Sequence, residues 1–88
     1  MQAVIKKKVL RRLRILEGQV RGVQRMVEQE KYCIDILNQS AAIRQAVTAI
    51  DTLILENHLE THVREQMRGS HGERAVHELI KVYKKLSA

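Results

Sequence analysis

The middle of this chain constrains its fold most, because it is too apolar to stand alone as a helix in water. Between Ile34 and Leu55, apolar residues occupy nearly every side of the helix that would contain them. They are Ile34, Ile36, Leu37, Ala41, Ala42, Ile43, Ala46, Val47, Ala49, Ile50, Leu53, Ile54 and Leu55. A helix that is apolar all round must be covered all round, whereas one neighbouring helix covers only one stripe. We therefore expect a second subunit to bury the rest.

An amphipathic helix is expected before this segment. From Val4 onward, apolar residues recur at helical spacing as far as Val27, with arginines and lysines on the other sides. The charged stretch 28–31 separates this helix from a second one, expected from about Tyr32 to about Arg68. No glycine or proline marks that boundary.

A short third helix is expected near the end of the chain. Gly69 and Gly72 interrupt the second helical pattern, and Ser70 stands three residues before Glu73, as in a capping box. With no proline and only two aromatic residues, both tyrosines, the core must be aliphatic. The sequence predicts an all-α fold with three helices.

The length of 88 residues predicts a single domain over 1–88 whose own core is thin, since domains below about 100 residues bury little surface. The single cysteine excludes a disulfide within the chain. Together with the lack of a signal peptide, it indicates a reducing cytoplasm. No apolar run approaches the roughly 20 residues that span a bilayer, so no membrane partner is expected.

The positive charge is concentrated near the start of the chain. Sixteen Lys and Arg against ten Asp and Glu give a formal charge of +6, and Glu17 is the only acid before Glu28. A basic surface of this kind favours a polyanion as partner, although a merely solvated surface is the alternative. The chain lacks the aromatic residues on which single-stranded nucleic acid stacks, and it shows no helix-turn-helix pattern. We expect double-stranded DNA to bind a broad basic face that contains Lys8, Arg12, Arg14, Arg21 and Arg44.

Three residues have the chemistry of metal ligands: Cys33, His58 and His62. A thiolate and two imidazoles suit copper(I), zinc, nickel or cobalt. The histidines are four residues apart, so both leave the same face of a helix. On one straight helix, however, Cys33 lies about 37 Å from His58 along the axis. One chain therefore cannot close the site.

An antiparallel dimer resolves this distance. If the expected second helix pairs with its copy around a two-fold axis near Ala46 and Val47, Cys33 of one chain faces the two histidines of the other. The axis then crosses the middle of the apolar segment. Ligand spacing and interface composition thus predict the same dimer, with two equivalent sites.

Other interpretations of these residues stay open at this point. A lone cysteine is usually a small buried hydrophobe, and histidines at a polar helix end are often solvated. Spacing alone does not separate a metal site from a reactive thiol. A helical metal-buffering or scaffolding protein would use the same site without DNA. An enzyme is not supported, because no nucleophile with a base, carboxylate pair or phosphate loop can be assembled.

Two segments resemble the copper-sensitive operon repressor family: residues 12–22, Arg-Leu-Arg-Ile-Leu-Glu-Gly-Gln-Val-Arg-Gly, and residues 32–37, Tyr-Cys-Ile-Asp-Ile-Leu. The resemblance, which extends to His58 and His62, covers nearly the whole chain. It implies three-helix protomers that form antiparallel dimers with a four-helix-bundle core, and disc-shaped homotetramers. It also implies that the unliganded protein binds operator DNA and releases it on binding an inducer.

The resemblance further implies roles for single residues. Cys33 and His58 match the first two copper ligands of the family, whereas the third, normally cysteine, is His62 here. Tyr32 and Glu78 match residues that surround the histidine ligand in copper sensors. The resemblance favours copper(I) in a trigonal Cys-His-His site, with zinc, nickel or cobalt next.

The same resemblance ranks the other inducers of the family. Nickel and cobalt sensors add a histidine and the amino terminus from the start of the chain, where this sequence has Met1, Gln2 and Ala3. Formaldehyde sensors use an amino-terminal proline where this chain has Gln2, and persulfide sensors need a second cysteine. Formaldehyde therefore ranks low, and persulfide is excluded.

Overall fold

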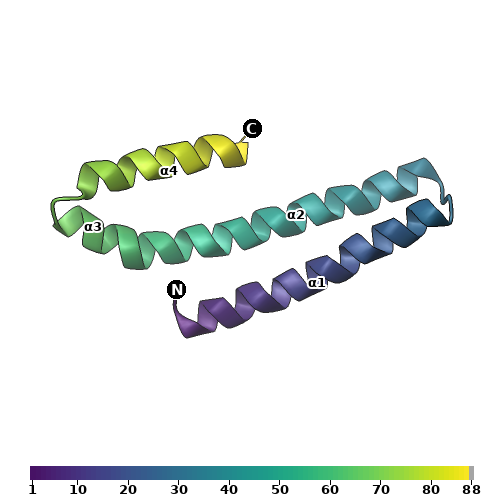
Figure 1. The fold of residues 1–88 in the computed structure, drawn as a ribbon, viewed down its shortest axis with the longest axis horizontal. Coiled ribbons are helices and arrows are strands. Elements are labelled where there is room, and N and C mark those ends of the chain that lie inside the picture. The colour runs from purple at the N-terminus through teal and green to yellow at the C-terminus, as the bar shows by residue number, and fades with distance from the viewer. Residues whose placement is uncertain (88) are drawn as a thin grey trace. The chain divides into compact units, whose positions relative to one another are not determined.

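The computed structural model describes residues 1–87 and is helical almost throughout. Its elements are α1 (Ala3–Glu28), α2 (Cys33–His58), the π-helical turn η1 (Leu59–Val63), α3 (Arg64–Arg68) and α4 (Gly72–Ser87) (Figure 1). No strand occurs within this range. Because α2, η1 and α3 follow one another without a break, they form the expected second helix as far as Arg68. The predicted all-α, three-helix fold is confirmed.

The turn between α1 and α2 explains a boundary that the sequence left unmarked. Glu30 has a φ of 53°, in the left-handed region that usually favours glycine. The amide of Glu30 donates to the Val27 carbonyl at 3.0 Å, and the amide of Lys31 donates to the Met26 carbonyl at 2.9 Å. These two bonds are those of a Schellman motif, which satisfies the last carbonyls of α1. Glu30 takes the left-handed position that glycine usually occupies in this motif. For this reason no glycine in the sequence marks the end of α1.

The start of α4 corrects the predicted capping box. The helix begins at Gly72, and the amide of Ala75 donates to the His71 carbonyl at 3.0 Å. His71 therefore precedes the first helical residue. The capping box would have required the helix to begin one residue earlier, after Ser70.

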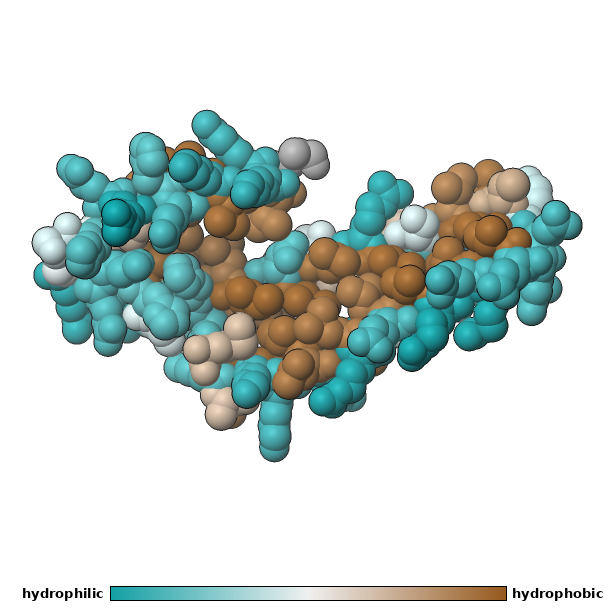
Figure 2. All heavy atoms as spheres, viewed as in Figure 1, coloured by the Kyte–Doolittle hydropathy of each residue, from teal (hydrophilic) through white to brown (hydrophobic). Residues whose placement is uncertain are grey.

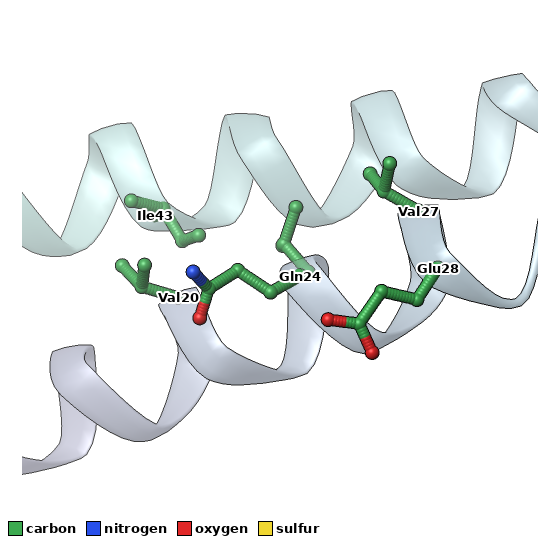
Figure 3. A pocket seen from close by; sticks show the side chains of 6 residues that line it. Val20, Gln24, Val27, Glu28 and Ile43 are labelled. Atoms are coloured by element: carbon green, nitrogen blue, oxygen red, sulfur yellow. The ribbon is translucent and has the colours of Figure 1, made fainter.

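The helices α1 and α2 form an antiparallel hairpin (Figure 1). Val20 of α1 and Ile43 of α2 point toward one another across an open groove, which Val23, Gln24, Val27 and Glu28 also line (Figure 3). On α2, Ile50 is buried. These contacts define the side of α2 that faces α1.

The chain comprises two compact units, Met1–Leu55 and a second one that begins at Glu56. A single domain over 1–88 stays a prediction. In the second unit, η1 and α4 both contact α3, with Val63 and Ala75 buried. No helix within residues 1–87 is long and apolar enough to cross a membrane.

Much of the apolar surface of the hairpin is uncovered. Brown, hydrophobic side chains of α1 and α2 are visible at its surface (Figure 2). Leu37 is 57% exposed, Val47 40% and Ile54 38%. Exposed apolar patches of this kind mark surfaces that bind a partner. This exposure agrees with the expectation that a second subunit covers α2.

Candidate metal centre

His58 and His62 lie together in the structure. His58 is the last residue of α2 and is half-buried, whereas His62 belongs to η1 and is exposed. Their ring centroids are 5.3 Å apart, with 37° between the ring planes. Two imidazoles that bind one ion through nitrogens about 2.0 to 2.1 Å from it have ring centres about 5 to 6 Å apart. The pair therefore fits two ligands of one ion.

Cys33 belongs to the other compact unit. It is the first residue of α2, and it is exposed and free. It stands at one end of this 26-residue helix and His58 at the other, which corresponds to a rise of about 37 Å. No group of three Cys, His, Asp or Glu residues that could hold a metal gathers within the described part of the chain. A three-ligand site that uses both histidines would therefore take its third ligand from another molecule.

The helical phase of α2 relates its two ends. From Cys33 to His58 is 25 residues, which is close to seven full turns at 3.6 residues per turn. On a regular α-helix, residues with this spacing project from the same side. A second helix packed antiparallel along that side would meet both of them.

The π-helical turn η1 is a feature that sequence reasoning missed. The Thr61 hydroxyl donates to the Asn57 carbonyl at 2.7 Å. Asn57 itself is 4% exposed, and its side-chain nitrogen is buried without an acceptor among residues 1–87. Turns of this type often occur at functional sites. No local sequence signal marks this single π turn, because five residues are too few to change the hydrophobic periodicity of a long helix visibly.

The residues expected to surround the metal ligands are both exposed. Tyr32 is 69% exposed, and its carbonyl accepts the amides of Asp35 and Ile36, so it precedes the first turn of α2. Glu78 lies on the exposed side of α4, and no hydrogen bond joins it to a histidine in the range 1–87. Their roles beside the metal stay predictions.

The five expected DNA-binding residues are exposed but do not share one stripe. Lys8, Arg12, Arg14 and Arg21 belong to α1, and Arg44 belongs to α2. At 3.6 residues per turn, Lys8 and Arg12 share one side of α1, whereas Arg14 and Arg21 lie on roughly the opposite side. The single basic face that we expected is therefore divided on one protomer.

Arg14 and Arg21 belong to a longer basic stripe. Positions that alternate by four and three residues along α1 are Lys7, Arg11, Arg14, Gly18, Arg21 and Arg25. The only ion pair found within residues 1–87 joins Arg21 to Glu17 at 4.0 Å and is exposed. A Cβ atom at Gly18 would meet nothing within 4 Å. This stripe is thus an open, strongly cationic side of α1, and Figure 2 shows hydrophilic side chains along the edge of α1 away from α2.

Comparison with known proteins decides the family. A family model described as metal-sensitive transcriptional repressor matches residues 5–85. The chain belongs to the metal-sensitive transcriptional repressor family. This is a family of transcription regulators and not of enzymes.

Individual relatives agree with this membership. The copper-sensing transcriptional repressor CsoR of Bacillus subtilis is 40% identical over 82 residues, which are 93% of this chain and 81% of that protein. CsoR of Mycobacterium tuberculosis strain H37Rv is 34% identical over 79 residues, which are 90% of this chain and 66% of that protein. The crystal structure of CsoR with Cu(I) from Geobacillus thermodenitrificans has a TM-score of 0.92 and 39% identity, covering 100% of this chain and 92% of that one.

Proposed function

We propose that this repressor binds operator DNA when it is free of metal and releases the DNA when copper(I) binds. The site is shared between subunits, with Cys33 from one chain and His58 and His62 from the other. One observation carries the proposal: α2 bears Cys33 and His58 at its opposite ends but on the same side. Antiparallel pairing through that side joins both ends into two equivalent sites.

The choice of copper(I) rests on ligand chemistry and on the relatives. A thiolate is a soft ligand that favours copper(I), and imidazoles accept it as well. The Bacillus subtilis relative is named as copper-sensing, and the similar crystal structure contains Cu(I). Zinc, nickel and cobalt are the competing inducers, because His62 stands where the family's copper sensors have cysteine.

Release of DNA follows from the thermodynamic linkage between metal binding and DNA binding. An inducer that lowers the affinity for DNA must bind the free protein more tightly than the DNA complex. The shared site ties the start of one α2 to the end of its partner, so binding there changes how the two subunits are held. We place this activity in the cytoplasm, where DNA is accessible and thiols such as Cys33 stay reduced.

The site is tested by the variant Cys33→Ala. We expect it to bind operator DNA normally and to lose release by copper(I), because the only thiolate is gone. Release is measured by fluorescence anisotropy of labelled operator DNA during titration with copper(I), nickel, cobalt and zinc. The control is His77→Ala, which removes an exposed histidine outside the site. Normal release from Cys33→Ala would refute the site.

Sharing between subunits is tested by mixing variants. Cys33→Ala and His58→Ala homo-oligomers each lack both sites, whereas their heterodimer regains one complete site. We therefore expect an equal mixture to recover about a quarter of the copper bound by the unmodified protein after subunit exchange, because half of the dimers are then heterodimers with one of two sites; copper is measured by competition with a chromogenic chelator. No recovery in a mixture shown to exchange subunits would exclude the antiparallel arrangement.

A further inference from the structure

A stripe of α2, next to the side that faces α1, consists mostly of exposed residues. Its positions alternate by four and three residues, the spacing of a helix-pairing seam. They are Cys33, Leu37, Ser40, Arg44, Val47, Asp51, Ile54 and His58. Leu37, Val47 and Ile54 are the exposed apolar residues described above. Ile43 and Ile50, which lie on the α1 side, do not belong to this stripe.

Two charges interrupt the apolar residues of this stripe. Arg44 is exposed and Asp51 is half-buried, and neither takes part in an ion pair within residues 1–87. They are seven residues apart, about 10.5 Å along the axis, so they cannot pair with each other in one chain. Their positions are nearly symmetric about Val47, three residues before it and four after it.

We propose that Arg44 of one subunit pairs with Asp51 of the other, and the reverse, on either side of the two-fold axis. This inference rests on the antiparallel dimer of the proposed function. In an antiparallel pair of identical helices, the residue numbers of two residues that face each other always add up to the same total. Arg44 and Asp51 give the same total as Cys33 and His62. The ion pairs therefore fit the register that places Cys33 opposite His62, whereas Cys33 directly opposite His58 would move the two-fold axis by two residues.

The charge pair also selects the direction of pairing. In a parallel dimer through the same stripe, Arg44 would face Arg44 and Asp51 would face Asp51. Like charges at a closed interface oppose association and exclude wrong partners. The otherwise apolar stripe accepts either direction, so these two residues discriminate against the parallel dimer. Arg44 thereby moves from the expected DNA-binding face to the subunit interface.

A charge exchange tests this pair. Arg44→Asp and Asp51→Arg each place like charges opposite one another, so we expect each to raise the dimer dissociation constant at least about tenfold. The double variant restores opposite charges and is expected to return within about threefold of the unmodified protein. The dissociation constant is measured by analytical ultracentrifugation. Arg21→Asp, an exposed charge reversal on α1, is the control and should leave it unchanged.

The outcomes separate the pair from the function. Single variants that associate normally, or a double variant that does not recover, would overturn the pair. If these variants do not fold, as judged by circular dichroism, a double-mutant cycle with Arg44→Gln and Asp51→Asn measures the same coupling. Additive effects of the two substitutions on the free energy of dimer formation would overturn the pair. Complementation between Cys33→Ala and His58→Ala reports independently on the proposed function. A different outcome is also possible: Arg44→Asp forms dimers normally but loses DNA affinity, and the double variant does not regain it. That outcome would overturn the pair and make Arg44 a phosphate contact.

Discussion

At the scale of single residues, we expect His62 to decide which metal the proposed site prefers. It lies 5.3 Å from His58 between ring centroids, so it is placed to share an ion with it. A second thiolate in its place would soften the ligand set. In the proposed site, Cys33 of the partner subunit would supply the first thiolate.

We therefore expect His62→Cys to raise the affinity for copper(I) at least about tenfold and to favour copper(I) over nickel and cobalt. His62→Ala should weaken the binding of every metal. Affinities are measured by competition with chelators of known strength under anaerobic conditions. A copper(I) affinity of His62→Ala equal to that of the unmodified protein would show that His62 is not a ligand.

At the scale of elements, the turn η1 sets the relation between the two histidines. A π turn closes its hydrogen bonds over five residues instead of four, so the helix rotates less per residue. Residues four apart, such as His58 and His62, are then more nearly aligned along the axis. Within this turn the Thr61 hydroxyl donates to the Asn57 carbonyl at 2.7 Å, a type of bond that often bends helices.

Removal of the Thr61 hydroxyl is expected to favour an ordinary α turn and to change the spacing of the histidines. Thr61→Val should weaken metal binding about 10- to 100-fold, the usual effect of groups that orient ligands. Thr61→Ser retains the hydroxyl and should restore the affinity. Thr52→Val is the matched control, because the Thr52 hydroxyl makes the same bond to the Thr48 carbonyl, at 2.9 Å, within the regular part of α2.

The absorption spectrum of bound cobalt(II) reports the geometry of the site, separately from affinity. We expect Thr61→Val to change it and Thr52→Val to leave it unchanged. If Thr61→Val and Thr61→Ser give the same spectrum and affinity as the unmodified protein, the turn does not orient the ligands.

At the scale of the whole molecule, the net charge of +6 per chain predicts that binding to operator DNA depends steeply on salt. The stripe of α1 that contains Arg14 and Arg21 carries three further basic residues, whereas Lys8 and Arg12 lie on the other side. We expect the first side to meet the phosphates. Gly18 lies in the middle of this stripe and has open space where a side chain would be, so the helix can approach the phosphates closely.

Replacing both Arg14 and Arg21 by Gln should reduce the slope of log affinity against log salt by about 1 for each phosphate that the variant no longer neutralises. Replacing Lys8 and Arg12 by Gln removes the same formal charge and should have a smaller effect. The slopes are obtained from anisotropy titrations at several salt concentrations. Equal slopes for the two double variants would mean that net charge, and not this stripe, governs binding.

Much of the fold and the candidate ligands followed from the sequence alone, because helical periodicity and ligand chemistry are local properties. The helix boundaries near Glu28 and Arg68 and the residue types of Cys33, His58 and His62 needed no tertiary information. The left-handed Glu30 was not predictable, since a chain adopts that conformation only where backbone hydrogen bonds compensate for its cost.

Only the tertiary structure decided which side of α2 stays uncovered. The sequence between Ile34 and Leu55 is apolar on nearly every side, so its periodicity could not separate the side that faces α1 from the one left for a partner. Packing against Val20 takes Ile43 into the hairpin and leaves Val47 at the surface. Leu37, Val47 and Ile54 are left exposed on α2. Burial depends on which residues meet across helices, and no local pattern contains that information.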